Sequence, residues 1–257
     1  MHIEIQTFQA TQPNTGAAGA ANTGDSLVVK NGKGKIEIIS SWATRQAAGF
    51  SQFNTPSSHD TTRGYRVGCA AAIGELTMCI GNSMRVEAQE TISNTIAGSN
   101  TAGDIELDSL LVFYENFPGI DMRSITPQQA LSRMEKITTV ESSIASVATG
   151  QYAEEAITAD SDLLQANRDY AVLGLSARTV SHALTLRAPD FGNIRVGVPG
   201  MLRPEISQQW FMLMSRAHNL PLVPVFNSGN KGNVNIGFVM NENAAATVVT
   251  AHLVMLK

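Results

Sequence analysis

The chain has 257 residues, of which 43% are hydrophobic, so it can bury a real core as one large domain or as two domains of ordinary size. Only 16% of its residues are charged, against about 25% in a typical soluble domain, which indicates a surface partly covered by other chains. The net charge is −4 and Lys/Arg runs are absent, which excludes an electrostatic footprint for nucleic acid.

Residues 1–26 end in the low-complexity string TQPNTGAAGAANTGD, which predicts an N-terminal arm held by a neighbouring subunit. Its IEIQTF segment (3–8) can add a strand to that neighbour. The arm has no Lys or Arg, so we expect no direct nucleic-acid binding. The start of the chain predicts neither a secretory signal nor a membrane span, and we expect synthesis in a reducing host cytoplasm.

Residues 27–117 are typical of short strands separated by turns. SLVVKNGKGKIEIISS predicts a hairpin whose turn is Asn31-Gly32. Cys69 and Cys79 lie in apolar strings, and we interpret them as small buried residues with free thiols.

Residues 118–165 predict a helical connector. Thr126 can cap a helix, Pro127 suits its first position, and Gln129 completes a capping box. The helix is expected to end at Gly150, and YAEEAITADSDLLQAN predicts a second one. The apolar stripe of the first helix would be Leu131, Met134, Ile137, Ile144 and Val147.

Residues 166–257 return to the strand pattern, with one interruption. The string RPEISQQWFMLMSRAHNL predicts a helix that begins at Pro204. Its apolar face would contain Ile206, Trp210, Leu213, Met214 and Ala217.

Two strings indicate an internal duplication. SSHDTTRGYRVG ends at Gly68 and APDFGNIRVG ends at Gly197, Arg45 and Arg178 occupy similar places upstream, and both blocks end in an apolar strand. Each block has room for about eight strands. We therefore predict an all-β fold with helical connectors, made of two tandem eight-stranded jelly rolls. The predicted parts are an arm (1–26), a first jelly roll (27–117), a helical connector (118–165) and a second jelly roll (166–257).

With these paired blocks, the connector, the helix PEISQQWFMLMSRAHNL and the N-terminal arm, the chain resembles the double jelly-roll major capsid proteins of tailless icosahedral double-stranded DNA viruses. The bacteriophage members of that family enclose an internal membrane. The resemblance implies a virion protein that forms homotrimers of pseudo-sixfold outline. It also implies contacts with neighbouring capsomers, and possible partners among other virion proteins and an internal membrane surface.

No residue is predicted to be catalytic, to bind a cofactor or to hold a metal. The five histidines (His2, His59, His182, His218 and His252) are far apart in the sequence. We interpret Asp60 of Ser58–Asp60, and its duplicate Asp190, as turn residues. GLSAR (174–178) lacks the last glycine of a nucleophile elbow, and GKGKIE (32–37) lacks the third glycine of a dinucleotide fingerprint.

Three further features also receive structural interpretations. NSGNKGN (227–233) predicts a hairpin turn. Trp42 and Trp210 are expected to anchor a core or an interface. Acidic side chains on the predicted connector are expected to face solvent or another subunit; they are Glu154, Glu155, Asp160 and Asp162.

Three classes of function fit these observations to different degrees. A structural shell protein agrees with the low charge, the duplication and the lack of catalytic clusters. A β-sandwich binding module of the spike or carbohydrate-binding type is the alternative, although an aromatic content of 6% argues mildly against it. A jelly-roll enzyme is disfavoured by the scattered histidines. The prediction is a non-enzymatic major capsid subunit.

Overall fold

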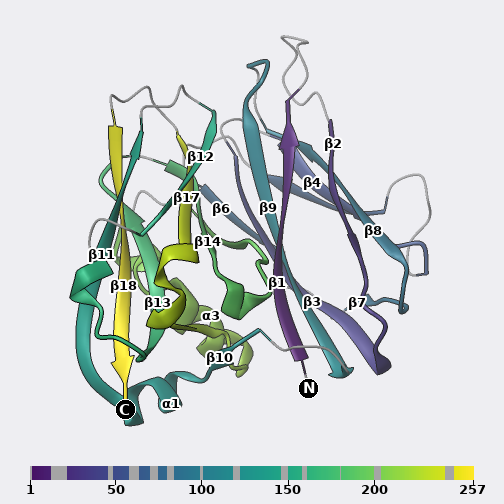
Figure 1. The fold of residues 1–257 in the computed structure, drawn as a ribbon. Helices are drawn as coiled ribbons and strands as arrows, with labels where there is room; N and C mark the ends of the chain where they lie inside the picture. The colour runs from purple at the N-terminus through teal and green to yellow at the C-terminus, as the bar shows by residue number, and fades with distance from the viewer. Residues whose placement is uncertain are drawn as a thin grey trace.

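The computed structural model describes residues 2–12, 22–45, 49–57, 64–69, 75–79, 84–98, 101–117, 122–145, 150–157, 161–179, 181–199, 204–240 and 246–257. Within these ranges, the side chains of residues 22, 43–45, 67–69, 75–79, 161, 182, 204 and 240 are outside the description. The fold is all-β with short helices, and its four sheets are antiparallel (Figure 1).

The first half of the chain forms two of these sheets. Sheet 1 has the order β1-β9-β3-β6, and the short β7 also pairs with β3. Sheet 2 has the order β2-β8-β4-β5. The strands are β1 (His2–Thr11), β2 (Asn22–Val28), β3 (Lys33–Arg45), β4 (Gly49–Asn54), β5 (Tyr65–Cys69), β6 (Glu75–Cys79), β7 (Met84–Arg85), β8 (Thr91–Ala97) and β9 (Ile105–Asn116).

The second half forms the other two sheets. Sheet 3 has the order β10-β16-β13-β18-β11, and sheet 4 has the order β12-β17-β14-β15. The strands are β10 (Ser124–Ile125), β11 (Met134–Ala145), β12 (Tyr152–Ala156), β13 (Asp169–Ala177), β14 (Ser181–Arg187), β15 (Val196–Pro199), β16 (Val223–Asn227), β17 (Asn235–Met240) and β18 (Ala246–Leu256).

The two halves share one strand order. Each half has eight strands when β6 and β7 are counted as one and β10 is left out. With the strands of each half numbered in this way, sheet 1 has the order 1-8-3-6, and sheet 3 has the same order when it is read from β11. Sheets 2 and 4 both follow the order second, seventh, fourth, fifth. The two Arg-Val-Gly strings fall on the fifth strand of each half, in β5 and at the start of β15. The predicted duplication agrees with this topology.

A shared irregularity strengthens the equivalence. The pairing of β3 with β9 shifts register between Ile38 and Ser40, where the partners are Val112 and Leu111. The pairing of β13 with β18 shifts between Val172 and Gly174, where the partners are Leu253 and His252. Because a β-bulge is a localised feature of a strand pair, these shifts align the two halves residue by residue.

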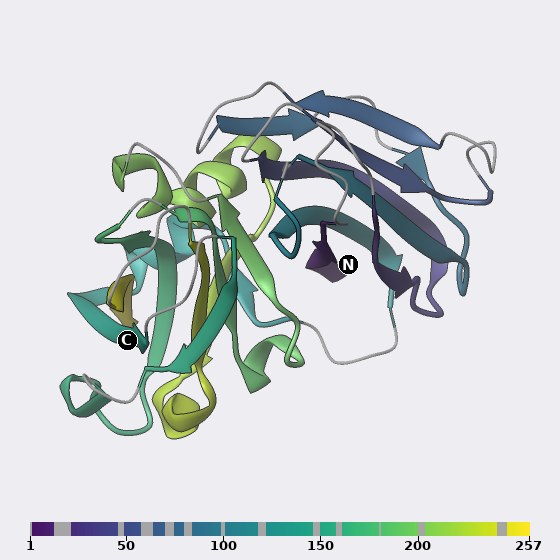
Figure 2. The same cartoon turned by 90° about the horizontal axis from the view of Figure 1, so that it is seen from above.

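The hydrophobic core explains why β9 is so apolar. One cluster fills the space between sheets 1 and 2 and includes Phe8, Phe53 and Val112. A larger cluster fills the second half and also includes Ile3 and Leu111 of sheet 1. Sheet 1 is therefore covered on both faces, and β9 is buried at every residue from Ile105 to Val112. Figures 1 and 2 show β1 and β9 between the bulk of the two halves.

The prediction of an N-terminal arm is wrong for residues 2–11. Residues 2–11 form β1, which pairs with β9 along ten residues of the same chain. Ile5 and Phe8 are buried because alternate β1 side chains enter the cores on the two faces of sheet 1. Residues 13–21 of the low-complexity string lie outside the described residues.

The predicted helical connector is also wrong. The capping box of Thr126 and Gln129 is present, and Pro127 is at the first position, but helix α1 (Pro127–Ser132) ends before Arg133. β11 then pairs with β18, and its buried residues Val140 and Ile144 follow strand periodicity. The β-branched run Ile137–Val140 favours this strand. The second predicted helix is β12 followed by the 3₁₀ turn η1 (Ser161–Leu163).

Two predicted hairpins are crossovers between sheets. β2 and β3 flank Asn31-Gly32 but belong to sheets 2 and 1. Residues 228–233 form the 3₁₀ helix η3 (Ser228–Asn233), which joins β16 of sheet 3 to β17 of sheet 4. Local turn residues do not reveal whether the chain reverses within a sheet or crosses to the opposite one.

The predicted helix at 204–219 is present but broken. It consists of α2 (Pro204–Ser207) and α3 (Trp210–His218), and Asn219 ends α3 in the left-handed conformation. Trp210 and Met214 are buried as predicted, whereas Leu213 is 38% exposed and its neighbour Phe211 is fully buried instead. A further 3₁₀ turn, η2 (Pro189–Phe191), contains Asp190.

Candidate functional site

The histidines do not form a metal or catalytic cluster in the described part of the chain. No group of three or more His, Cys, Asp or Glu side chains there could hold a metal ion. His2, His218 and His252 lie in β1, α3 and β18. The side chains of His59 and His182, of Ser58 and Asp60, and of Cys69 and Cys79 lie outside the description.

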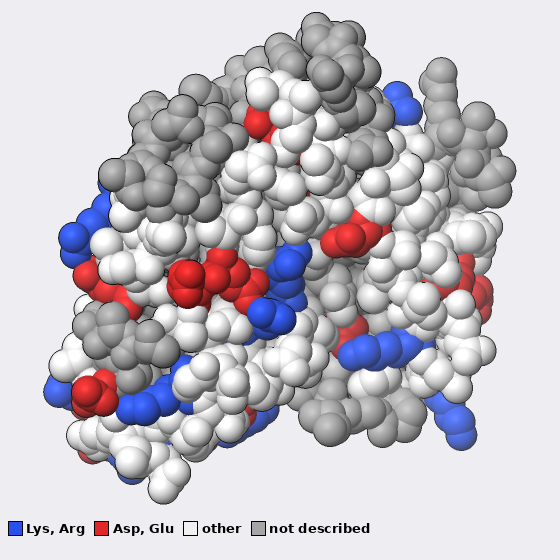
Figure 3. Space-filling view, turned by 45° about the horizontal axis from the view of Figure 1, so that its top comes forward, with Lys and Arg blue, Asp and Glu red and all other residues white. Residues whose placement is uncertain are grey.

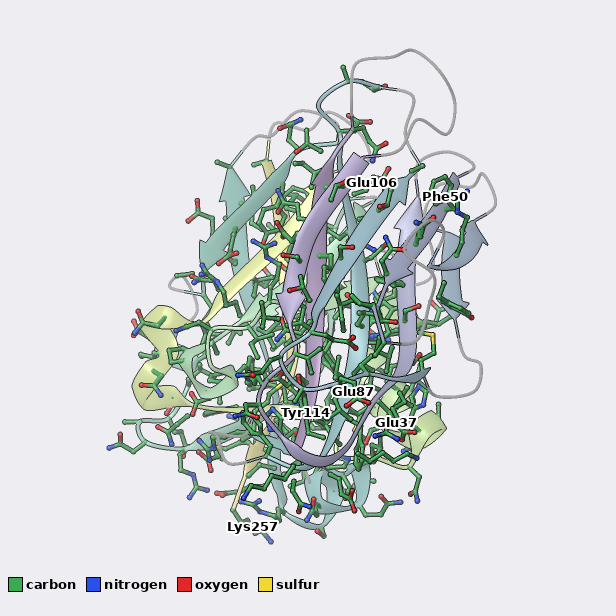
Figure 4. The ribbon with its side chains drawn as sticks, turned by 90° about the vertical axis from the view of Figure 1, so that its right-hand side faces the viewer. Glu37, Phe50, Glu87, Glu106, Tyr114 and Lys257 are labelled. Atoms are coloured by element: carbon green, nitrogen blue, oxygen red, sulfur yellow. The ribbon has the colours of Figure 1, made fainter. Side chains whose placement is uncertain are left out.

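His2 belongs to a buried polar group that anchors β1. The fully buried Glu4 carboxylate lies 2.9 Å from His2 Nε2 and pairs with the Lys30 ammonium. Tyr114, labelled in Figure 4, donates to Glu4 at 3.5 Å, and burial raises the pKa of its hydroxyl. The His2 ring stacks on Phe117 with centroids 4.3 Å apart. These contacts hold the start of β1 in place within the first half.

Asp190 lies in the 3₁₀ turn η2 and connects it to residues that are distant in the sequence. Its carboxylate pairs with Arg123 at 3.0 Å and accepts hydrogen bonds from Asn227 N and Asn230 Nδ2. Arg123 also pairs with Asp169 at 2.7 Å. Burial acts to raise the pKa of Asp169, but hydrogen bonds from Asn227 and Arg123 outweigh it and lower the pKa. The NSGNKGN segment is thereby fixed to sheet 3 and η2.

The acidic residues of the supposed connector lie on β12 or near it. Glu154 accepts a hydrogen bond from the Tyr152 hydroxyl at 2.7 Å and pairs with Arg187. Burial is the main reason that the pKa of Tyr152 rises to about 12. Asp162 is exposed, 3.7 Å from Lys231, Glu155 is exposed, and Asp160 lies outside the description.

The structure reveals one side-chain pair that the sequence analysis missed. Ser176 of GLSAR lies on β13, and its Oγ is 2.8 Å from His252 Nε2 on β18. Burial lowers the pKa of His252, which favours the neutral ring. Among the described residues no carboxylate hydrogen-bonds to the other ring nitrogen, so the pair lacks the third group of a triad. Only the pairing of β13 with β18 brings the two residues together.

The junction between the halves is formed by sheets 1 and 4. The outer face of sheet 4 lies on the outer face of sheet 1, where β15 contacts β1, β3 and β9 and β14 contacts β3. A small cavity there is lined by Trp42, Leu107 and Ser109 from sheet 1 and by Ala183, Gly197, Val198 and Pro199 from sheet 4.

The two tryptophans anchor this junction. Trp42 of β3 and Trp210 of α3 are both 3% exposed. Their rings meet edge to face with centroids 5.7 Å apart, in a geometry that aromatic pairs favour. The prediction that they anchor a core is confirmed, and it is the core that joins the two halves.

The repeated glycine has a steric role in the second half. A Cβ atom at Gly197 would overlap Ser109 Oγ and lie 2.7 Å from Thr7 Oγ1, both on sheet 1. Only glycine therefore allows β15 to approach sheet 1 this closely. The side-chain surroundings of Gly68 are outside the description.

The two repeated arginines occupy equivalent positions but have different neighbours. Arg195 lies over the Tyr152 ring at 4.7 Å and donates across the junction to Gln9 Oε1 at 3.1 Å. Arg66 lies over the Phe50 ring at 4.0 Å and donates to Gln52 of its own sheet at 2.6 and 2.8 Å. Arg66 is exposed on sheet 2, and Phe50 of the same sheet is labelled on the right-hand side of Figure 4.

Charge is sparse on the surface. On the face shown in Figure 3, the acidic and basic residues form small groups separated by wide uncharged areas. None of the helices in the described residues has the length and hydropathy of a membrane span.

Comparisons with known proteins identify no family. No protein-family profile and no curated protein matches the chain. Among solved structures, it is similar to the PBSX exported protein XepA (12% identity, 98% of this chain and 86% of that one, TM-score 0.30). It is also similar to the major capsid protein P2 of bacteriophage PM2 (8% identity, 99% and 98%, TM-score 0.23) and to the STIV major capsid protein (10%, 98% and 97%, TM-score 0.25). All three TM-scores lie below 0.5, so these likenesses establish neither a family nor a function.

Proposed function

We propose that this chain is a non-enzymatic subunit of an icosahedral virus shell and that it assembles into homotrimers. In this proposal each half is an eight-stranded jelly roll, the first running from β1 to β9 and the second from β11 to β18. The strand orders of sheets 1 and 3 and of sheets 2 and 4 support it, since they fit two units of one topology. Jelly rolls of this kind build viral shells, lectins and cupins.

One observation favours a shell over the other jelly-roll functions. The two halves pack head to tail, because sheet 4 of the second half lies on sheet 1 of the first, and these sheets have different strand orders. A heterologous contact of this kind generates a ring when its rotation closes. Three chains would supply six such halves, which gives the pseudo-sixfold outline of a trimeric capsomer.

The surface composition supports the same proposal. Charged residues make up 16% of the chain, and uncharged surface loses little on being covered by a neighbour. The proposal requires no direct binding to nucleic acid, in line with a net charge of −4. The virion is accordingly the proposed location.

Sedimentation velocity and negative-stain electron microscopy of the purified protein test this function. We expect trimers at micromolar concentration and, under assembly conditions, closed particles of uniform size. A folded protein that stays monomeric at every concentration, and never forms particles, contradicts the proposal.

A further inference from the structure

We propose that the part of the outer face of sheet 3 which the helices leave uncovered is the docking surface for a second copy of this chain. Helices α2 and α3 pack against β13, next to Gly174, and Ala130 and Met212 cover Val254 and Leu256 at one end of the face. We call the remaining surface the open face, and its described residues come from β11, β13 and β18. The inference deepens the proposed function, on which it rests, because it assigns the contact between copies to particular side chains. The open face contains Ile137, Thr139, Glu141, Ser143, Ser176, Val248, Thr250 and His252.

The bulge alignment gives each residue of the open face a counterpart on sheet 1. Leu111 corresponds to His252, because each pairs with the first residue after the register shift. That residue is Ser40 in β3 and Gly174 in β13. The partners on the first strand then correspond as well, so that Ile5, opposite Leu111, matches Thr139, opposite His252. By the same register Ile3 matches Ile137 and Trp42 matches Ser176.

The counterparts of the open face are the residues that the junction covers. Ile3 is 5% exposed and belongs to the core cluster that fills the second half, and Ser109 is 3% exposed where β15 approaches sheet 1. In the second half the counterpart of Ile3 is Ile137, which is 63% exposed. An apolar side chain thus remains in solvent at a position where the second half covers sheet 1. In the proposed contact a second copy covers it.

The other side chains of the open face suit burial against protein. Ser176 and His252 satisfy each other through the 2.8 Å hydrogen bond. Glu141 is held by Arg178 NH2 at 2.8 and 3.0 Å, so its charge is already compensated. Threonine, serine and valine make up the remainder of the face. Satisfied polar groups cost less to desolvate than unpaired ones, which makes this face suitable for a reversible contact.

The occupant is the outer face of sheet 2 of the next copy. Within the chain, the face that lies on sheet 1 belongs to sheet 4, and sheet 2 has the same strand order as sheet 4. Arg66 of sheet 2 is the counterpart of Arg195, which donates to Gln9 across the junction. The counterpart of Gln9 is Ser143, two residues from Glu141 on the same face. Arg66 of one copy is therefore placed to donate to Ser143 of the next.

The test compares substitutions on the two faces with matched controls. Ile137→Asp places an unpaired carboxylate in the contact, and Leu163→Asp makes the same change at a residue of similar exposure, 61%, in the β12–β13 connection. Arg66→Glu alters the opposite face, and Arg85→Glu, at an exposed arginine of β7, is its control. Thermal unfolding checks that all four variants fold, and sedimentation velocity measures their association.

We expect Ile137→Asp and Arg66→Glu to weaken association by about tenfold or more while both controls behave as the wild type does. A contact between these faces also predicts that Ile137→Ser, which adds no charge, weakens association less than Ile137→Asp.

If the wild type forms trimers that Ile137→Asp and Arg66→Glu leave unchanged, the face assignment is wrong and the shell function stands. If the wild type is monomeric at every concentration, the open face has another occupant and both proposals fail.

Discussion

The outer faces of sheets 1 and 3 occupy the same place in two units of the same topology, yet the second half of the chain covers the first, whereas α2 and α3 cover only part of the other. The covered face presents Trp42, Ile5 and Leu111, all at most 3% exposed. The open face has Ser176, Thr139 and His252 at the same positions. The comparison shows that a permanent contact within the chain uses large apolar side chains, whereas a face that spends time in water uses small polar ones.

Truncating the anchor of the covered face should have the largest effect. We expect Trp42→Ala to lower the free energy of unfolding by about 3–5 kcal/mol, because it removes a buried aromatic side chain and its contact with Trp210. Ser176→Ala, at the equivalent open position, should cost less than about 1.5 kcal/mol. Urea unfolding of both variants measures the difference. Equal losses would mean that the junction adds no stability.

Filling the close approach of the two halves should have the next largest effect. Gly197→Val forces β15 away from Ser109 and Thr7, and overpacking of this kind costs about 1–3 kcal/mol. Gly232→Val is the control, since nothing lies within 4 Å of a Cβ atom there. Urea unfolding should show a clear loss for the first variant and little change for the second. If Gly197→Val left the free energy of unfolding unchanged, the two sheets would not be in close contact at this position.

Two partly buried histidines, His252 on the open face and His218 on α3, should make the protein sensitive to acid. Burial lowers the pKa values of His252 and His218 below the ordinary value of 6.5. The unfolded chain therefore binds more protons than the folded one below about pH 6.5, so stability falls as the pH decreases through that region and is unaffected well above it.

The unfolding temperature, measured from about pH 7.5 to about pH 5, tests this expectation. His252→Leu gives the open face the leucine that the covered face has at Leu111, and it should remove part of the acid loss. The part that remains should become smaller when His218 is also replaced. A wild-type unfolding temperature that does not fall in acid would contradict the stated direction.

The two repeated arginines should show the smallest difference. Arg195→Gln loses the bond to Gln9 across the junction and the contact with Tyr152, for about 0.5–1.5 kcal/mol. Arg66→Gln changes an exposed residue and should stay within about 0.5 kcal/mol in the monomer. Unfolding of dilute protein separates the two. A larger loss for Arg66→Gln would reverse the assignment of covered and open positions.

The long-range order of the fold was partly visible in the sequence, because the two RVG strings do fall on equivalent strands. Local helix signals were less reliable. Thr126, Pro127 and Gln129 correctly mark where α1 begins, but the stripe after it belongs to a strand, since pairing with β18 outweighs helical spacing. The low-complexity string after β1 similarly concealed that His2–Thr11 pairs with β9, more than ninety residues away.

The junction and the open face were not predictable from the sequence. Trp42 and Trp210 could be expected to anchor a core, but their contact depends on how two complete halves pack. Ser176 and His252 are 76 residues apart and meet only through strand pairing. Their signal, a serine and a histidine each in an apolar strand, is too common to identify a pair.

Hydrogen–deuterium exchange at low and high protein concentration tests most directly the central claim that one face is covered within the chain and the other between chains. Amides of β1 should be equally protected at both concentrations, because the pairing with β9 and the cover by the second half do not depend on concentration. Amides of β11 from Ile137 to Ser143 should be less protected in dilute protein, where only the pairing with β18 holds them, and should gain protection in concentrated protein. Exchange in β11 that stays the same while the protein assembles would contradict the claim.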